Sequence, residues 1–174
     1  MLKMIHIEKS FNIGTINEKK VLNDLSLTIN DGDFITVIGG NGAGKSTMLN
    51  TIAGVYKVEG GRILLDGQDI TYKSETDRAR YIGRVFQDPM MGTAPTMMIE
   101  ENLAMAYRRT KKRGLGWGIT SKEREIYRKA LAQLNLGLED RMTTKVGLLS
   151  GGQRQAVTLL MATLQKPKLL LLDE

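Results

Sequence analysis

The densest run of chemically useful residues in this chain is GGNGAGKST, at positions 39–47. It fits the pattern G-x-x-x-x-G-K-[ST], in which glycines let successive backbone N–H groups point at phosphate oxygens. The apolar stretch 34–38 before it predicts a strand, and a helix is expected to begin near Met48 and to direct its N-terminus at the same anion. A glycine-rich turn is the plainer alternative. The complete pattern between strand and helix favours a site for a nucleoside triphosphate, and its predicted ligands are Gly39, Asn41, Gly42, Ala43, Gly44, Lys45, Ser46 and Thr47.

Cleavage of a terminal phosphate requires a cation for the developing charge, a metal ion, and a group that orients or deprotonates the attacking water. Lys45 has the length to reach the β- and γ-phosphates, so it is a predicted catalytic residue. The Ser46 hydroxyl can ligate Mg²⁺, and Thr47 can donate to an inner phosphate. The same run therefore predicts both a phosphate cradle and part of a metal site.

Two carboxylates follow the apolar run 169–172 at the end of the sequence. A carboxylate at the carboxyl end of a buried parallel strand faces the phosphates, so Asp173 is a predicted magnesium ligand. Glu174 comes next and is the predicted general base for water. A charged pair can end any strand, but the phosphate-binding run upstream favours the catalytic interpretation.

A second glycine cluster, LSGGQ, occupies positions 149–153. Ser150 is placed to cap the following helix, while Gly151 and Gly152 expose backbone N–H groups at its start. A plain capped helix is the alternative. The pattern predicts a second anion site made by Ser150, Gly151, Gly152 and Gln153.

Half-buried strands are predicted at 3–7 and 25–29, where apolar and polar residues alternate. A further strand is predicted at 62–65, before a tight turn at Asp66 and Gly67. The first part of the chain thus combines antiparallel strands with a nucleotide-binding unit.

The region 87–149 predicts an inserted helical lobe. Thr120 and Glu123 have the spacing of a capping box, and Gly137 is expected to end that helix. Another helix is expected from Gly151, and the leucines of 169–172 predict a strand buried on both faces. The predicted division is 1–88 for the core with the β subdomain, 89–150 for the helical subdomain, and 151–174 for the return to the core.

Composition limits the classes of protein. The chain has 174 residues, no cysteine and a net charge of +6, so disulfides and thiolate metal sites are excluded. No apolar run approaches a membrane span, and charges near the start break any signal-peptide core. The basic cluster 108–113 predicts either a solvated segment or a contact with anionic lipid.

The chain contains three motifs in this order: the phosphate-binding run 39–47, LSGGQ at 149–153, and the leucine strand followed by Asp173 and Glu174. In this order of motifs it closely resembles the ATP-binding subunits of ATP-binding cassette (ABC) transporters. The LSGGQ motif separates this family from kinases, GTPases and helicases. The resemblance implies an α/β fold, a P-loop NTPase core of the ABC ATPase type with an N-terminal antiparallel β subdomain and an inserted α-helical subdomain. It also implies ATP and Mg²⁺ as cofactors, and a head-to-tail homodimer in which LSGGQ of one subunit closes on the γ-phosphate held by the other.

The resemblance assigns further roles. Phe11 resembles the aromatic residue that stacks on adenine, with packing at a strand end as the alternative. Gln87, in VFQDP, resembles the glutamine that contacts Mg²⁺ or the attacking water, and is a predicted catalytic and metal-binding residue. A group of methionines follows at the position where the family forms a groove for a helix of the membrane subunit, and packing inside the lobe is the alternative role. The group consists of Met90, Met91, Met97 and Met98.

The sequence also departs from the family pattern. Ala156 and Met161 stand where many importer subunits carry arginine. The sequence given ends at Glu174, before the family's D-loop and switch histidine, and His6 is expected to be a core or edge-strand residue. The 174-residue chain is therefore expected to bind ATP but to hydrolyse it poorly.

The resemblance implies an ATP-hydrolysing subunit that energises solute transport, more in the manner of an importer than of an exporter. Its implied partners are a second ATP-binding subunit, a transmembrane permease and, as a further option, a solute-binding protein, at the inner face of the cell membrane on the cytoplasmic side. A hydrolysis-deficient short form and a soluble ABC ATPase acting on nucleic acid are the alternatives. No nucleic-acid partner is expected, because only about sixty residues separate Gln87 from LSGGQ, too few for a long coiled-coil insertion.

Overall fold

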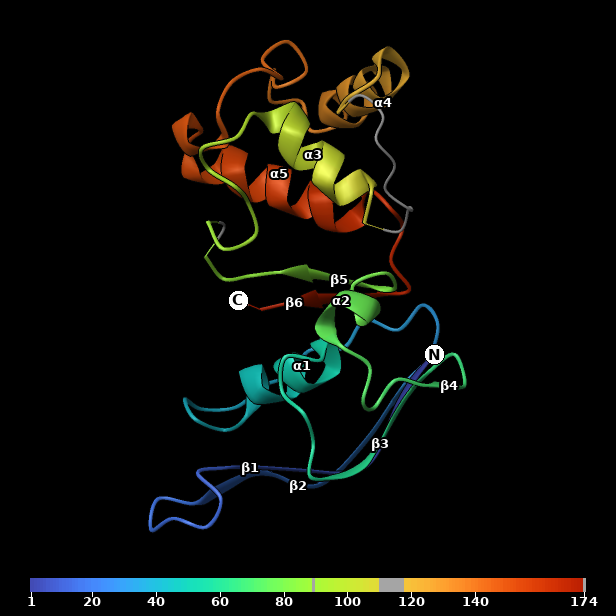
Figure 1. Cartoon of the computed structure of the whole chain (residues 1–174), viewed down its shortest axis with the longest axis vertical. Helices are drawn as coiled ribbons and strands as arrows, with labels where there is room; N and C mark the ends of the chain where they lie inside the picture. The colour runs from blue at the N-terminus through green and yellow to red at the C-terminus, as the bar shows by residue number, and fades with distance from the viewer. Residues whose placement is uncertain (89, 110–117, 174) are drawn as a thin grey trace. The chain divides into compact units, whose positions relative to one another are not determined.

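The computed structural model describes residues 1–88, 90–109 and 118–173 (Figure 1). The predicted base Glu174 and part of the predicted basic cluster, residues 110–113, lie outside the described residues. The chain forms two compact units, Met1–Ala79 and Arg80–Glu174, called unit 1 and unit 2 below. The predicted three-part division stays a prediction.

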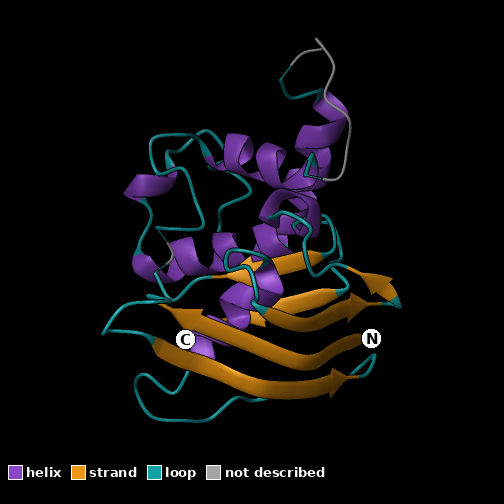
Figure 2. Cartoon of the chain, turned by 60° about the horizontal axis from the view of Figure 1, so that its bottom comes forward, coloured by secondary structure: helices purple, strands orange, loops and turns teal. Residues whose placement is uncertain are grey.

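Unit 1 contains a four-stranded antiparallel sheet with the order β2-β1-β3-β4 (Figure 2). Alternate side chains of the central strand are buried, among them Leu2 and Met4, which pair with Leu65 and Ile63 of β3. The strands predicted at 3–7, 25–29 and 62–65 are confirmed. Their bounds are β1 Leu2–Phe11, β2 Lys19–Ile29, β3 Gly60–Leu65 and β4 Gln68–Asp69.

The predicted tight turn between β3 and β4 is also confirmed. Asp66 and Gly67 both have positive φ, 49° and 76°, which is the conformation that a two-residue hairpin requires. The prediction for His6 is wrong, because this residue is exposed and lies in β1, which has a strand on each side. A register irregularity between Met4 and Ile7 turns its side chain toward Asp24, and their Nδ1 and Oδ1 atoms are 2.5 Å apart.

The strand predicted at 34–38 does not form in the part of the chain that the structure describes. The segment is irregular, and the Phe34 and Ile38 side chains are 88% and 90% exposed. A strand is stabilised by hydrogen bonds to a neighbouring strand, and none of the described strands pairs with this segment. Apolar composition alone was therefore insufficient to predict the element.

Helix α1, Lys45–Ala53, follows the phosphate-binding run as predicted and starts slightly earlier than Met48. Helix α2 is a single turn, Glu75–Arg78, capped by Ser74. Its last residue, Arg78, is only 2% exposed and donates hydrogen bonds to the carbonyls of Thr51 and Ile52, at the C-terminal end of α1. This buried arginine joins the two helices of unit 1.

Unit 2 contains two parallel strands and a helical cluster. Strands β5 (Ile82–Val85) and β6 (Leu169–Leu172) pair in register from Ile82 and Leu169. Burial of β6 on both faces was predicted, but Leu172 is 45% exposed because only β5 pairs with it among the described strands. The helices are α3 Ile99–Tyr107, α4 Ser121–Ala132, the 3₁₀ helix η1 Val146–Leu148 and α5 Gly151–Thr163.

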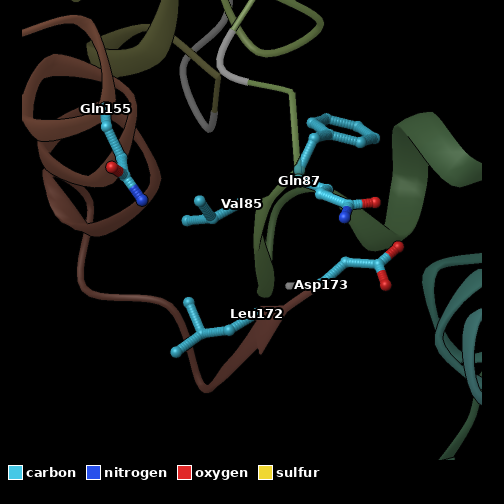
Figure 3. A pocket seen from close by; sticks show the side chains of 6 residues that line it. Val85, Gln87, Gln155, Leu172 and Asp173 are labelled. Atoms are coloured by element: carbon cyan, nitrogen blue, oxygen red, sulfur yellow. The ribbon is translucent and has the colours of Figure 1, made fainter. Parts of the chain in front are cut away.

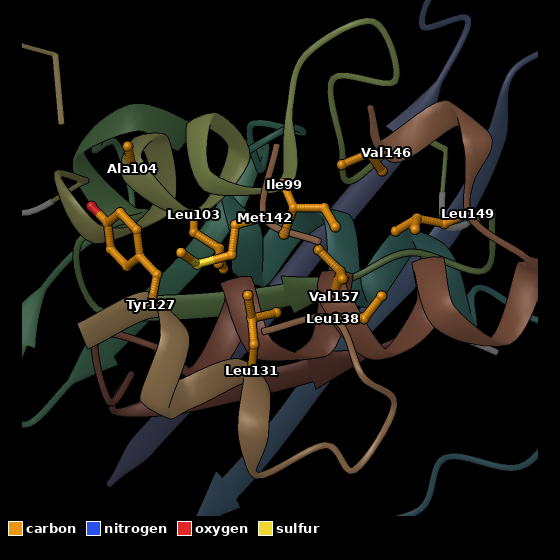
Figure 4. Close-up of a cluster of buried hydrophobic side chains, with 10 residues drawn as sticks. All are labelled: Ile99, Leu103, Ala104, Tyr127, Leu131, Leu138, Met142, Val146, Leu149 and Val157. Carbon is orange, nitrogen blue, oxygen red and sulfur yellow. The ribbon is translucent and has the colours of Figure 1, made fainter. Parts of the chain in front are cut away.

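A hydrophobic cluster holds α3, α4 and α5 together (Figure 4). The capping box of Thr120 and Glu123 is present at the start of α4, as predicted. Gly137 does not end this helix, which stops at Ala132. Asn135 already has a positive φ of 53° before that glycine is reached. The cluster consists of Ile99, Leu103, Ala104, Tyr127, Leu131, Leu138, Met142, Val146, Leu149 and Val157.

Candidate functional site

The phosphate-binding run of unit 1 has the backbone that an anion cradle needs. Gly42 and Gly44 have φ of 78° and 93°, in the left-handed region. A Cβ on Gly44 would lie 3.0 Å from the Val21 Cγ1 and 3.3 Å from the Val21 carbonyl, so β2 supports the loop closely. Helix α1 begins directly after Gly44 and has no acidic residue in its first turn, which leaves its positive dipole end suited to a phosphate.

Lys45 lies inside this loop. Its Nζ donates hydrogen bonds to the carbonyls of Gly39 at 2.5 Å and Gly40 at 2.9 Å. A phosphate oxygen forms a stronger bond with an ammonium group than a neutral carbonyl does. The geometry therefore suits the predicted role of Lys45, in which its ammonium turns from the loop to a bound polyphosphate.

Sequence reasoning missed Lys19, the first residue of β2. Its Nζ lies 4.0 Å from the position that a Cβ on Gly42 would occupy, so a second ammonium reaches the loop. A lysine at a strand end is ordinary in a sequence. Only the path of β2 past the loop indicates that Lys19 lies beside Gly42.

Phe11 ends β1 and pairs with Lys19 across the sheet. Its ring meets the Tyr56 ring edge to face, with centroids 5.2 Å apart and planes at 85°. The Lys9 ammonium lies 5.3 Å from the same ring centroid. The packing alternative for Phe11 is therefore present in the structure, and adenine stacking by this residue stays a prediction.

In unit 2, the carboxyl ends of β5 and β6 bring two predicted site residues together. The Asp173 N–H donates to the Val85 carbonyl at 3.1 Å, which continues the pairing of Val85 with Leu172. Gln87 and Asp173 then line one open hollow of about 270 Å³ (Figure 3). Sequence reasoning expected both residues at a phosphate site and missed Gln155 of α5, which lines the same hollow.

The Asp173 carboxylate is 23% exposed and has a cation beside it. The Arg84 Nη2 lies 3.6 Å from the Asp173 Oδ2, and the Arg84 side chain is 14% exposed. The Arg84 guanidinium also lies 4.3 Å from the centroid of the Phe86 ring. An arginine on a strand carries no functional signal in a sequence, so this pairing was not predicted.

The LSGGQ segment has the predicted capped helix start. Ser150 Oγ accepts a hydrogen bond from the Gln153 N–H at 3.3 Å, and Gln153 Oε1 accepts one from the Ser150 N–H at 3.2 Å. A Cβ on Gly151 or Gly152 would meet no atom within 4 Å, so the first turn of α5 is open. Binding of a phosphate by these residues stays a prediction.

The donor set fits magnesium. The predicted ligands Ser46, Gln87 and Asp173 supply hydroxyl, amide and carboxylate oxygens, the hard ligands that Mg²⁺ prefers. Within residues 1–88, 90–109 and 118–173, no group of three or more His, Cys, Asp or Glu could hold a metal ion. Unit 1 thus offers one of these ligands and unit 2 offers two, which suits Mg²⁺ that keeps phosphate and water ligands and takes only one or two ligands from a protein unit. A shared ion between the two units stays a prediction.

The predicted methionine group is largely on the surface. Met90, Met91 and Met98 are 39%, 70% and 37% exposed, whereas Met97 is half-buried. Packing inside the lobe therefore accounts for only part of this group. The exposed thioethers can adapt to a partner surface.

The comparisons with known proteins agree with these motifs. A family model described as "ABC transporter" matches residues 22–174. The chain belongs to the ABC transporter family. The tyrosine transport ATP-binding protein of Clostridioides difficile is 41% identical over the whole chain, which spans 69% of that protein. The spermidine/putrescine import ATP-binding protein PotA of Haemophilus ducreyi is 38% identical over the whole chain, which spans 42% of its length.

Solved structures of ABC cassettes share the fold. The dimeric cassette MJ0796, in a post-hydrolysis state bound to ADP and Pi, superimposes with a TM-score of 0.82 and 27% identity. The alignment covers 100% of this chain and 74% of that one. CbiO1 of Clostridium perfringens, part of the complex cbiONQ, has a TM-score of 0.76 and 27% identity, with 99% and 64% of the two chains covered. The predicted P-loop NTPase fold of the ABC ATPase type is confirmed.

None of the helices in the described part of the chain is both long and apolar enough to cross a membrane.

Proposed function

We propose that this ABC cassette binds ATP with Mg²⁺ and hydrolyses it to energise the uptake of a solute. The observation that carries the proposal is the phosphate cradle, in which left-handed Gly44 turns the chain into α1 beside Lys45. The family match over residues 22–174 supports ATP as the ligand. The name of PotA, an import ATP-binding protein, supports uptake rather than export.

Each proposed residue has a limited task. Lys45 binds the β- and γ-phosphates, Thr47 donates to an inner phosphate, and Phe11 stacks on the base. When bound, Mg²⁺ would supply positive charge against the charge that develops on the phosphates. Asp173 and Ser46 would each supply an oxygen ligand to this ion. Gln87 orients the attacking water from the hollow at the ends of β5 and β6.

Two further roles are proposed, one for Glu174 and one for the start of α5. Glu174 accepts the proton of the attacking water. Ser150, Gly151 and Gly152 close on the γ-phosphate held by a second copy in a head-to-tail dimer. The dimeric MJ0796 cassettes support the second copy as a partner.

A membrane permease is the proposed partner on the transport side, and a solute-binding protein is the further partner that an importer uses. CbiO1, which is part of the complex cbiONQ, supports assembly with other subunits. The proposed docking surface includes exposed Met90, Met91 and Met98. The cassette then lies at the inner face of the cell membrane.

The test of ATP binding compares the wild-type protein with Lys45→Ala, using fluorescent ATP at fixed Mg²⁺. Loss of a charge-assisted contact to phosphate is expected to weaken binding by about thirtyfold. Lys57→Ala is the matched control, because Lys57 is an exposed lysine of the same unit. Equal affinities of Lys45→Ala and wild type would refute the assigned cradle.

The transport function is tested by identifying the macromolecule that co-purifies with this protein from cells. Co-purification with a hydrophobic membrane subunit, lost when Met91 is changed to Glu, is the expected result. Met105→Glu, at a 42% exposed methionine of α3, is the control. Co-purification with RNA or DNA in place of a membrane subunit would replace this function with that of a nucleic-acid ATPase.

A further inference from the structure

Arg84 lies on β5, beside the carboxylate that is proposed to hold magnesium. Strand register places it there, since Arg84 pairs with Leu171 of β6 and Asp173 comes directly after the last residue of that strand, Leu172. The Asp173 N–H is bound to the Val85 carbonyl at 3.1 Å, so the two strands still run together where the carboxylate begins. The 3.6 Å separation of the two side chains is thus a product of the sheet.

The position of Arg84 does not depend on Asp173. Its guanidinium carbon lies 4.3 Å from the Phe86 ring centroid, a distance typical of a cation held over an aromatic face. The side chain is 14% exposed, and its Nε is buried with no hydrogen-bond partner among the residues that the structure describes. Arg84 is therefore a largely dehydrated cation held by stacking.

The pair between Arg84 and Asp173 is loose. A charge-assisted N–H···O bond is about 2.8 Å long, whereas this separation is 3.6 Å. At this distance the guanidinium makes no short hydrogen bond to the carboxylate but still offsets part of its charge. Asp173 keeps 23% of its side chain exposed and faces the hollow that it shares with Gln87. Another cation can therefore reach the same carboxylate.

We propose that Arg84 is a positioning residue that neutralises Asp173 in the nucleotide-free protein and competes electrostatically with Mg²⁺ for that carboxylate. The inference rests on the proposed function, in which Asp173 belongs to the metal shell. A dication that approaches Asp173 meets a guanidinium that stays stacked on Phe86. Mg²⁺ alone is thereby disfavoured, and it binds together with phosphates whose negative charge outweighs the charge of Arg84.

The experiment measures binding of fluorescent ATP to the full-length protein as free Mg²⁺ is varied. The neutral variants Arg84→Met and Arg84→Gln are expected to reach half-maximal binding at about one fifth of the wild-type Mg²⁺ concentration. Arg84→Lys keeps the charge and is expected to stay within about twofold of wild type. The matched control is Arg128→Met, because Arg128 lies 3.7 Å from Asp140 in the same unit, away from the β5 and β6 ends.

The possible results are distinguishable. Neutral variants that need as much Mg²⁺ as wild type, or more, would overturn the inference, and Arg84→Gln decides the matter if Arg84→Met does not fold. An equal shift in Arg128→Met would overturn it too, because the cause would then be net charge. A wild-type protein that binds no nucleotide overturns the proposed function and this inference with it, whereas normal binding with unshifted variants overturns the inference alone.

Discussion

Arg78 offers the sharpest test of how unit 1 is held together. The side chain is 2% exposed and donates to four backbone carbonyls: Thr51 and Ile52 at 2.8 Å each, Thr71 at 2.7 Å and Lys73 at 3.1 Å. Burial lowers the pKa of its guanidinium from the ordinary value, and the nearby Asp69 carboxylate partly opposes that shift. The arginine thus closes the C-terminal end of the helix that begins at the phosphate cradle.

Replacement of Arg78 by Met removes all four bonds and leaves the carbonyls buried. Bonds from a charged donor each contribute about 1.5–3 kcal/mol, but the variant also removes the cost of burying the charge. We therefore count each bond at about 1 kcal/mol, which gives a loss of about 4 kcal/mol in the free energy of unfolding. The melting temperature is expected to fall by about 10 °C.

Urea unfolding of wild type, Arg78→Met and Arg78→Lys measures this effect. Arg78→Lys is expected to fall between the other two, because an ammonium keeps the charge but cannot span four acceptors in a plane. Arg80→Met is the control, since Arg80 is exposed and close in sequence. A free energy of unfolding for Arg78→Met within about 1 kcal/mol of wild type would refute the reasoning.

Three further predictions follow from single side chains. Lys19→Met is expected to weaken ATP binding about fivefold in a direct binding assay, while adenosine binding stays unchanged. Lys20→Met is the control, because Lys20 pairs with Glu8 at 2.9 Å, and it should bind ATP and adenosine as wild type does. The pKa of Glu123 is lowered from 4.5, chiefly by the hydrogen bond from the Thr120 N–H and also by Arg108. The Glu123 carboxylate therefore stabilises the fold fully above pH 4.5, and this stabilisation is lost as the pH falls through the lowered pKa. Glu123→Gln should therefore cost about 1 kcal/mol at pH 7 in urea unfolding and progressively less below pH 4.5; a constant difference would contradict this. The Tyr127 hydroxyl is buried without a hydrogen-bond partner among the described residues, and burial raises its pKa to about 12. Tyr127→Phe is therefore expected to unfold at the same urea concentration as wild type or at a higher one. A fall of more than about 1 kcal/mol in the free energy of unfolding would show that the hydroxyl makes a stabilising hydrogen bond.

Predictions from the sequence succeeded where a short segment contains all the relevant information. The turn at Asp66 and Gly67, the capping box begun by Thr120, the Ser150 cap of α5 and the turn into α1 at Gly44 all depend on residues within a few positions. Predictions failed where a distant partner was needed. The apolar segment 34–38 pairs with none of the described strands, and Leu172 is exposed at a place where burial was expected.

The features of the candidate site also fall into these two groups, those set by local sequence and those set by distant partners. The sequence by itself determined the left-handed glycines of 39–47, the capped helix start at LSGGQ and the carboxylate after β6, because backbone conformation and helix capping at these places follow from local residue types. The tertiary structure alone decided that Lys19 reaches the loop at Gly42 and that Arg84 lies beside Asp173. Both contacts depend on which strand passes which segment and in what register, and no local pattern encodes that choice, because the two partners lie far apart in the sequence.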